Sequence, residues 1–276
     1  ALYLSLMAFN PINKFISFPA YVCSSLSHAT RLSHGKEILI DNSKDSPNVD
    51  LKKLKATTPD ISIIPYMYGN PIDISEYSNN IIEDCCQSLG AKIKGTLTGL
   101  LGDIGIFSFY ATKIITTGGQ GGMIVSKNNE TIKKIRNFLD YDQKLDQYSK
   151  FNFTLTDLQA SVGIQQLKKL PTFLKRREFI FNKYDEALPM FKNLDNNIDP
   201  IYYRALLKCK NPKKVVEKLN LKNIHAVLPM ENWIDENKFP NAYDFCSNHV
   251  SLPIYPSLTD DDVERIISVT RQIQLE

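Results

Sequence analysis

One block of the sequence, residues 81–123, gathers the side chains whose types and spacing could do chemistry. Asp84 closes an apolar run, Ser108 lies in the next run among aromatic residues, and Lys113 follows five positions later. Four of the chain's twelve glycines then fall within residues 118–122. A strand-end carboxylate, a hydroxyl, an amine and a glycine-rich turn could together bind an anionic ligand and supply a nucleophile, because glycine lets the backbone approach a ligand closely.

Pyridoxal phosphate is a cofactor that needs this set of groups. Its aldehyde requires a lysine amine, its pyridine nitrogen requires an anion that keeps it protonated, and its phosphate requires hydroxyls and backbone amides. Spacing alone leaves plainer interpretations open. Asp84 could be a turn residue at a strand end, Lys113 a solvated lysine, and the glycines a tight hairpin.

Short apolar runs predict the strands that position these residues. They lie at 15–18, 37–40, 61–66, 81–84, 104–110 and 122–126, and connectors of helix length separate several of them, one with helical spacing at 49–55. This pattern predicts an α/β domain with a mainly parallel sheet flanked by helices. In such a sheet ligands bind beyond the carboxyl ends of the strands, where Asp84 is expected.

The pattern changes after residue 156. Apolar residues recur at helical spacing through 158–170, and Pro171 either starts a second helix or kinks one long helix. Strand-like residues follow at 201–203, then helical ones at 212–219, and Thr259 can cap a final helix. We therefore predict a large cofactor-binding domain over 1–165 and a smaller α+β C-terminal domain over 166–276.

Composition narrows the function classes. The chain has 276 residues, of which 43% are hydrophobic and 23% charged, as in soluble globular proteins. A net charge of +3 argues against general nucleic-acid binding. The longest nearly apolar stretch, residues 1–9, is too short to cross a membrane. Five cysteines without a C-x-x-C pair and four scattered histidines predict neither a disulfide framework nor a metal site, and favour the cytoplasm.

The block at 81–123 resembles the sugar-nucleotide aminotransferases, a family of fold-type I pyridoxal phosphate enzymes that aminate keto sugars. The segments at 63–71, 152–167 and 251–259 resemble that family's strand before the cofactor aspartate, its domain-joining helix and its last strand. The similarity extends from about residue 1 to about residue 270. It implies a fold-type I enzyme that moves an amino group, with glutamate as the expected donor, onto a nucleotide-linked keto-deoxysugar for surface polysaccharide or glycoconjugate biosynthesis.

The resemblance also implies roles for individual residues. Lys113 matches the lysine that binds the cofactor aldehyde as a Schiff base, and Asp84 matches the partner of the ring nitrogen. Gln87 matches a contact to the ring oxygen, and Ser108 matches a phosphate ligand. Asn152 matches an asparagine that reaches the phosphate in the neighbouring subunit, which implies a homodimer with shared sites.

The chain departs from the family pattern at several positions. Tyr66 and Thr154 stand where histidine and arginine are common. An aromatic residue normally stacks on the cofactor ring; Tyr21 or Cys23 lies near that position, and only Tyr21 could stack. The family usually has a small pair such as Gly-Thr before the segment that starts at Ala1, so we expect the N-terminal part of the large domain to be missing and the cofactor to bind more weakly.

Three functions remain open at this point. The first is an active pyridoxal phosphate-dependent aminotransferase, which the residues Asp84, Gln87, Ser108 and Lys113 favour. The second is a truncated, non-catalytic paralogue that keeps the fold-type I scaffold, which Thr154 favours. The third is a dehydratase variant of the same family; those enzymes replace the cofactor-binding lysine, so Lys113 argues against it.

Overall fold

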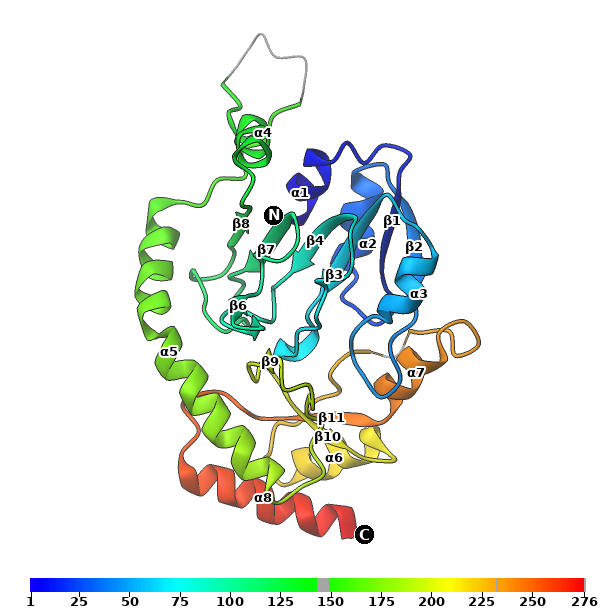
Figure 1. The fold of residues 1–276 in the computed structure, drawn as a ribbon. Helices are drawn as coiled ribbons and strands as arrows, with labels where there is room; N and C mark the ends of the chain where they lie inside the picture. The colour runs from blue at the N-terminus through cyan, green and yellow to red at the C-terminus, as the bar shows by residue number, and fades with distance from the viewer. Residues whose placement is uncertain (143–148, 232, 276) are drawn as a thin grey trace.

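The computed structural model describes residues 1–142, 149–231 and 233–275 of the chain, and Figure 1 shows their arrangement. In chain order the elements are α1 (Leu2–Ala8), β1 (Phe15–Pro19), α2 (Ser25–Leu32), β2 (Lys36–Ile40), α3 (Leu51–Ala56), β3 (Ile61–Pro65), the 3₁₀ turn η1 (Met67–Gly69), β4 (Asn80–Asp84), β5 (Lys92–Ile93), β6 (Thr96–Leu97), β7 (Ile104–Ser108), β8 (Gly122–Val125), α4 (Asn129–Leu139), α5 (Asp157–Asp185), β9 (Ile198–Asp199), β10 (Ala205–Lys208), α6 (Pro212–Leu221), α7 (Pro240–Ser247), β11 (His249–Leu252) and α8 (Asp260–Leu275).

A six-stranded sheet forms the centre of the N-terminal half, with the order β2-β1-β3-β4-β7-β8. The first five strands run parallel to their neighbours, and β8 runs antiparallel to β7. Asp84 is the last residue of β4 and lies in register with Pro65 of β3 and Ile106 of β7. All six predicted strands are confirmed, and so is the α/β fold class with a mainly parallel sheet.

Both faces of this sheet are covered, because successive strand residues point to opposite sides. Ile82 packs into a core with α1, α2 and α4 on one face, whereas Ile81 packs into a core with Leu54 of α3 on the other. The alternation continues to the end of β4. Glu83 therefore shares a face with Ile81, and Asp84 shares a face with Ile82.

The C-terminal half has a core of its own. Ile180 and Tyr184 of α5 pack there with β10, β11, α6 and α8. Helix α5 runs along one side of the molecule from the large sheet to α8 (Figure 1). It contains Pro171, so the alternative of one long helix is the one observed. The predicted boundary near residue 165 lies within this helix, and the division into domains stays a prediction.

The predicted strand at 201–203 is wrong. Backbone N–H groups of Ile201 and Tyr203 donate to the carbonyl oxygens of Gly69 and Tyr68, at 2.9 and 3.2 Å. These bonds tie the segment to η1, and the strand of this region, β10, begins only at Ala205.

Two negative findings concern the part of the chain that the structure describes. None of its helices combines the length and apolar character that crossing a bilayer would require. No group of three or more His, Cys, Asp and Glu side chains there is arranged to hold a metal ion.

Candidate active site

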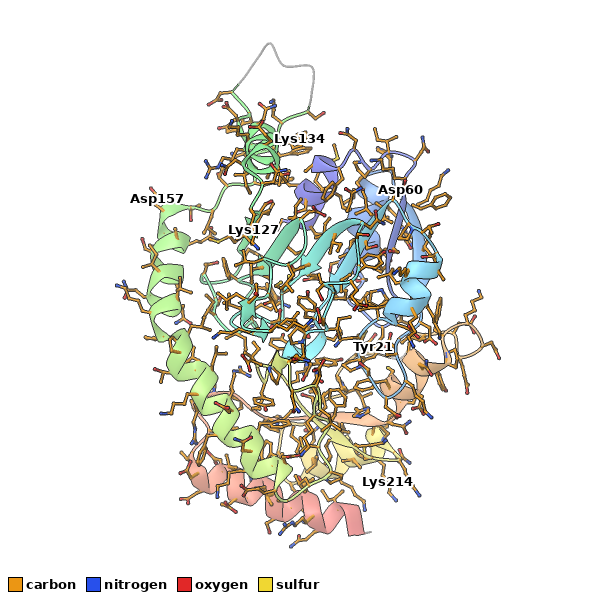
Figure 2. All side chains as sticks on the ribbon, viewed as in Figure 1. Tyr21, Asp60, Lys127, Lys134, Asp157 and Lys214 are labelled. Carbon is orange, nitrogen blue, oxygen red and sulfur yellow. The ribbon has the colours of Figure 1, made fainter. Side chains whose placement is uncertain are left out.

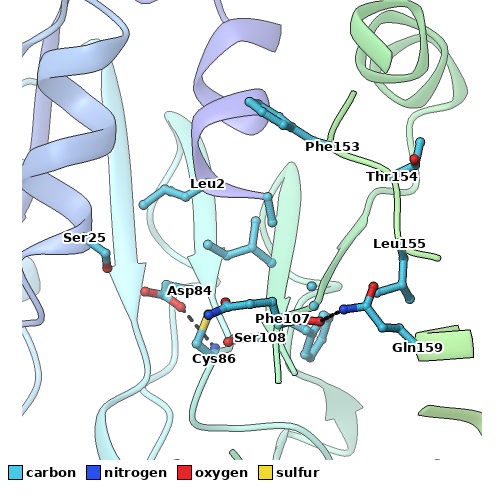
Figure 3. A pocket seen from close by; sticks show the side chains of 15 residues that line it. Leu2, Ser25, Asp84, Cys86, Phe107, Ser108, Phe153, Thr154, Leu155 and Gln159 are labelled. Carbon is cyan, nitrogen blue, oxygen red and sulfur yellow. Dashed lines mark hydrogen bonds between the residues drawn. The ribbon is translucent and has the colours of Figure 1, made fainter. Parts of the chain in front are cut away.

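Asp84 lies at the carboxyl edge of the sheet, at the wall of a cavity of about 530 Å³ (Figure 3). Only 9% of its surface is exposed, and its Oδ1 accepts one hydrogen bond, from the Cys86 N–H at 3.0 Å. Among the described residues no cation pairs with it. A buried carboxylate is costly unless a positive group compensates it, so this position suits a cationic ligand.

Lys113 lies in the loop at 109–121, which connects β7 to β8. The Thr117 N–H donates to the Phe109 carbonyl oxygen (3.1 Å) and the Phe109 N–H to the Gly121 carbonyl oxygen (2.9 Å), and these bonds hold the two ends of the loop together. Gly121 packs against the Thr117 hydroxyl with no room for a side chain. This loop brings Lys113 to the wall of a second hollow of about 320 Å³, which Asp84 also lines.

Gln87 and Ser108 line the second hollow. In each, the side-chain oxygen accepts a hydrogen bond from a backbone N–H, and the side-chain hydrogens remain available to a ligand. The Tyr68 N–H donates to Gln87 Oε1 at 2.7 Å, which leaves the Gln87 amide N–H groups for a ligand. The Tyr110 N–H donates to Ser108 Oγ at 3.3 Å, which leaves the Ser108 hydroxyl hydrogen for a ligand. Both side chains can therefore donate hydrogen bonds to an oxygen-rich molecule.

The thiol of Cys86 is not set up as a nucleophile. Burial raises its pKa, and the negative charge of Asp84 raises it further. The thiol therefore stays protonated at neutral pH, and a protonated thiol is a poor nucleophile. Cys86 contributes its backbone N–H to Asp84.

The position of Tyr21 corrects the expectation that it stacks on a cofactor ring. Tyr21 is fully buried, its hydroxyl lies 2.6 Å from that of Tyr68, and its ring packs edge-on against Phe245. Figure 2 labels Tyr21 in the middle of the packed side chains, whereas Lys134 and Lys214 lie at the periphery. Tyr21 lines neither hollow described above; Cys23, two residues on, lines the second.

The structure does not bring Asn152 to Ser108 within one chain. Asn152 is exposed, and its Oδ1 accepts a hydrogen bond from Thr154 Oγ1 at 3.1 Å. Its neighbours Phe153, Thr154 and Leu155 line the first cavity. The role of Asn152 in the neighbouring subunit stays a prediction.

Sequence reasoning missed two polar residues of the site. Gln120 lines both hollows, and its carbonyl oxygen accepts a hydrogen bond from Gln159 Nε2 at 3.2 Å. Its place inside the glycine-rich turn is a signal that could have found it. Ser25 also lines both hollows from the start of α2, and no motif in the sequence marks it.

These residues fit pyridoxal 5′-phosphate. The unpaired Asp84 carboxylate suits its protonated ring nitrogen, and the amine of Lys113 suits its aldehyde. The hydrogens left free on Gln87 and Ser108 suit its ring oxygen and its phosphate. Two adjoining hollows that share Asp84, Cys86 and Ser108 provide space for a ring and a phosphate together.

Comparison with known proteins gives a consistent result. The model of the DegT/DnrJ/EryC1/StrS aminotransferase family matches residues 1–271. The UDP-4-amino-4,6-dideoxy-N-acetyl-beta-L-altrosamine transaminase of a Campylobacter jejuni strain is 32% identical, with 96% of this chain and 80% of that protein covered. The spore coat polysaccharide biosynthesis protein SpsC of Bacillus subtilis is 27% identical, with 99% and 82% covered. A DegT DnrJ EryC1 StrS aminotransferase from Brucella abortus shares the fold, with a TM-score of 0.90 at 22% identity over 100% of this chain and 84% of that one.

Proposed function

The chain belongs to the DegT/DnrJ/EryC1/StrS aminotransferase family, and on that premise we propose that it transfers an amino group from an amino acid, with glutamate as donor, to the keto group of a nucleotide-linked deoxysugar. As a member of this family, the chain is a pyridoxal phosphate-dependent aminotransferase. We further propose that the aminosugar product serves surface polysaccharide or glycoconjugate biosynthesis.

The convergence of Asp84, Gln87, Ser108 and Lys113 at the sheet edge carries this proposal. When bound, the cofactor supplies an electron sink for the bonds at the donor's α-carbon. The Asp84 carboxylate holds the proton on the ring nitrogen. Lys113 Nζ anchors the cofactor and moves the proton at the donor's α-carbon. Gln87 orients the ring through its oxygen, and Ser108 donates to the phosphate.

The names of the relatives support the substrate class. The Campylobacter protein is named for transamination of a UDP-linked amino-dideoxy sugar, and the Bacillus protein for spore coat polysaccharide biosynthesis. A keto sugar offers the carbonyl that accepts an amino group, and this carbonyl must approach the Lys113 side of the site, which the second hollow forms.

The first test locates the cofactor. The purified chain is loaded with pyridoxal phosphate, reduced with borohydride and digested, and the adduct is mapped by mass spectrometry. We expect the adduct on Lys113 and none in Lys113→Ala. Lys127→Ala, which removes an exposed lysine after β8, is the matched control and keeps the adduct. An adduct that persists in Lys113→Ala contradicts the assignment.

The second test measures turnover. Glutamate and UDP- or GDP-linked 4-keto-6-deoxyhexoses are incubated with the loaded enzyme, and the aminosugar is detected by mass spectrometry. We expect the product with at least one of these sugars and none with Lys113→Ala. Cofactor on Lys113 without any amino transfer would contradict the proposed activity and support the non-catalytic relative instead.

We also propose a homodimer. Leu158, Ile164 and Leu167, on the N-terminal half of α5, are exposed although they are apolar, and Phe153 beside them is exposed as well. Such exposed apolar side chains around one helix are typical of an interaction surface, and Asn152 lies just before this part of the chain. Light scattering at micromolar concentration should give the mass of two chains; a monomer that holds the cofactor would contradict this proposal.

The cytoplasm is the location we propose. Cys23, Cys85, Cys86, Cys209 and Cys246 are all free thiols in the structure. Free thiols persist where the compartment is reducing. Fractionation of cells that express the protein tests this location, and recovery from an oxidising compartment would contradict it.

A further inference from the structure

A segment of the C-terminal half, residues 201–204, lies against the turn that supports Gln87. Ile201 and Tyr203 donate their backbone N–H groups to Gly69 and Tyr68, as described above. Gly69 has a φ of +84° and touches the Ile201 carbonyl, with no room for a side chain. The segment is therefore packed against the large domain at its backbone.

Arg177 of α5 holds the same segment from the other side. Only 9% of Arg177 is exposed, and its Nη1 donates to the carbonyl oxygens of Tyr202 and Tyr203 at 3.1 and 3.2 Å. Among the described residues no carboxylate pairs with this guanidinium, and its Nε has no hydrogen-bond partner. A buried cation is thus committed to two backbone carbonyls, which fixes where the Tyr203 side chain leaves the backbone.

The Tyr203 side chain reaches the lysine of the active site. Its ring centroid lies 5.5 Å from Lys113 Nζ, and its hydroxyl donates to the carbonyl oxygen of Thr112 at 3.4 Å. An ammonium within about 6 Å of an aromatic ring is attracted by the ring's negative face. Within the described parts of the chain, Lys113 Nζ makes no hydrogen bond or ion pair, and the Tyr203 ring is the aromatic ring that lies against it.

We propose that Tyr203 is a positioning residue for Lys113: its aromatic face holds the amine at the second hollow, and the long bond of its hydroxyl to the residue before the lysine adds little to this. This inference rests on the proposed role of Lys113. According to this proposal, Tyr203, in the C-terminal half of the chain, contributes to the chemistry at the edge of the large sheet. Arg177 and η1 act through Tyr203 by fixing its backbone.

The test compares three variants of the full chain. Tyr203→Leu removes the ring, Tyr203→Phe keeps the ring and loses the hydroxyl, and Tyr202→Leu is the matched control. Tyr202 lies in the same segment, under the same arginine, but its ring stacks on Phe181 in the C-terminal core. Melting curves and circular dichroism establish that each variant folds; Tyr203→Gln, which lacks a ring but keeps a polar chain, replaces Tyr203→Leu if that variant does not fold.

The first readout needs no activity. The cofactor-free chains are labelled briefly with acetic anhydride, and the acetylated fraction of Lys113 is measured relative to Lys127 by mass spectrometry. Removing the ring uncovers and frees the amine, so we expect Tyr203→Leu to label Lys113 about threefold faster or more. Tyr203→Phe and Tyr202→Leu should stay within about twofold of the parent chain, because both keep the ring over the lysine.

The second readout is the split between kcat and KM. A misplaced lysine slows proton transfer without weakening donor binding, so we expect kcat of Tyr203→Leu to fall about three- to thirtyfold, the range of a cation–π contact. KM for glutamate should change less than about twofold, and Tyr203→Phe should restore most of kcat.

Three outcomes would overturn the inference. Tyr203→Leu could match the parent in labelling and kcat, Tyr203→Phe could be as impaired as Tyr203→Leu, or Tyr202→Leu could have the same effect. The failure of the proposed function looks different. It would appear as a cofactor adduct that persists in Lys113→Ala, whatever the Tyr203 variants do.

Discussion

Two neighbouring carboxylates at the end of β4 serve opposite faces of the sheet and have opposite surroundings. Glu83 is fully buried, and its two oxygens accept four hydrogen bonds, from the N–H groups of Gly99, Leu101 and Gly102 and from the Tyr66 hydroxyl, at 2.6–2.9 Å. Among the described residues, the Asp84 carboxylate is hydrogen-bonded only to Cys86, through its N–H and through its thiol, and it lines a cavity.

The difference shows how one strand can serve both scaffold and chemistry. Because side chains alternate along a strand, adjacent residues enter two separate environments. The Glu83 carboxylate is stabilised by hydrogen-bond donors of the protein itself, and these bonds hold the loop at 99–102 in place. The Asp84 charge is left for a ligand. Changes at the two positions should therefore separate loss of folding from loss of function.

The largest expected effect is on turnover, from Asp84→Asn. Removing one partner of a buried charge pair costs about 3–5 kcal/mol, so we expect kcat to fall roughly 10²- to 10⁴-fold. The melting temperature should stay close to that of the parent, because asparagine can keep the hydrogen bond from the Cys86 N–H. Asp261→Asn, at an exposed position of α8, is the control. Turnover close to that of the parent would remove Asp84 from the mechanism.

The next effect is on folding, from Glu83→Gln. Glutamine has one carbonyl oxygen, so its NH₂ group must face two of the four donors. The less costly orientation places this group toward Gly99 and Tyr66, since the Tyr66 hydroxyl can turn and accept. We expect the free energy of unfolding to fall by about 3 kcal/mol, roughly a hundredfold in the folding equilibrium. Urea unfolding measures it.

A matched control for that change is Glu37→Gln. Glu37 pairs with Arg31 near the surface, where an ion pair contributes at most about 1 kcal/mol. The comparison fails if Glu83→Gln is no more destabilising than Glu37→Gln. It also fails if Glu83→Gln unfolds at the same urea concentration as the parent but loses turnover, because Glu83 would then act in the chemistry.

The sequence predicted the role of Asp84 but not that of Glu83. The carboxyl edge of a parallel sheet accounts in advance for the place of Asp84, whereas the pairing of Asp84 with Lys113 came from the family resemblance. Glu83 could not be assigned, because its donors come from a loop whose path depends on tertiary packing. Tyr21 shows a finer limit: which of a few neighbouring residues faces a cavity depends on the local backbone, and the family pattern left the choice between Tyr21 and Cys23.

A smaller effect is expected at Gln87, which lies on the Asp84 side. Gln87→Glu keeps the oxygen that accepts from the Tyr68 N–H but replaces the free N–H groups with a second oxygen. The variant loses one donor to the cofactor and places a carboxylate against its ring oxygen, so we expect its dissociation constant for pyridoxal phosphate to rise about tenfold or more, at least about 1.4 kcal/mol. Titration of the cofactor-free chain measures it, with Gln272→Glu on α8 as the control. An unchanged constant would exclude Gln87 as a cofactor contact.

The smallest expected effect, from Tyr66→Phe, tests the Glu83 side. The Tyr66 hydroxyl donates to Glu83 Oε2 at 2.9 Å, and burial, reinforced by the Glu83 charge, raises the pKa of Tyr66 well above its usual range. Near pH 7 we expect Tyr66→Phe to lower the free energy of unfolding by about 1 kcal/mol.

Above about pH 10 the phenol of Tyr66 ionises in the unfolded chain but stays protonated in the folded one. The unfolded state then binds fewer protons, so the parent loses stability as the pH rises. Phenylalanine has no proton to release, so the gap between the two chains should narrow between about pH 9 and pH 11 in urea unfolding. The other buried tyrosines are common to both chains and cancel from this difference. A gap that stays constant with pH would show that Tyr66 ionises equally in both states and is not held by Glu83.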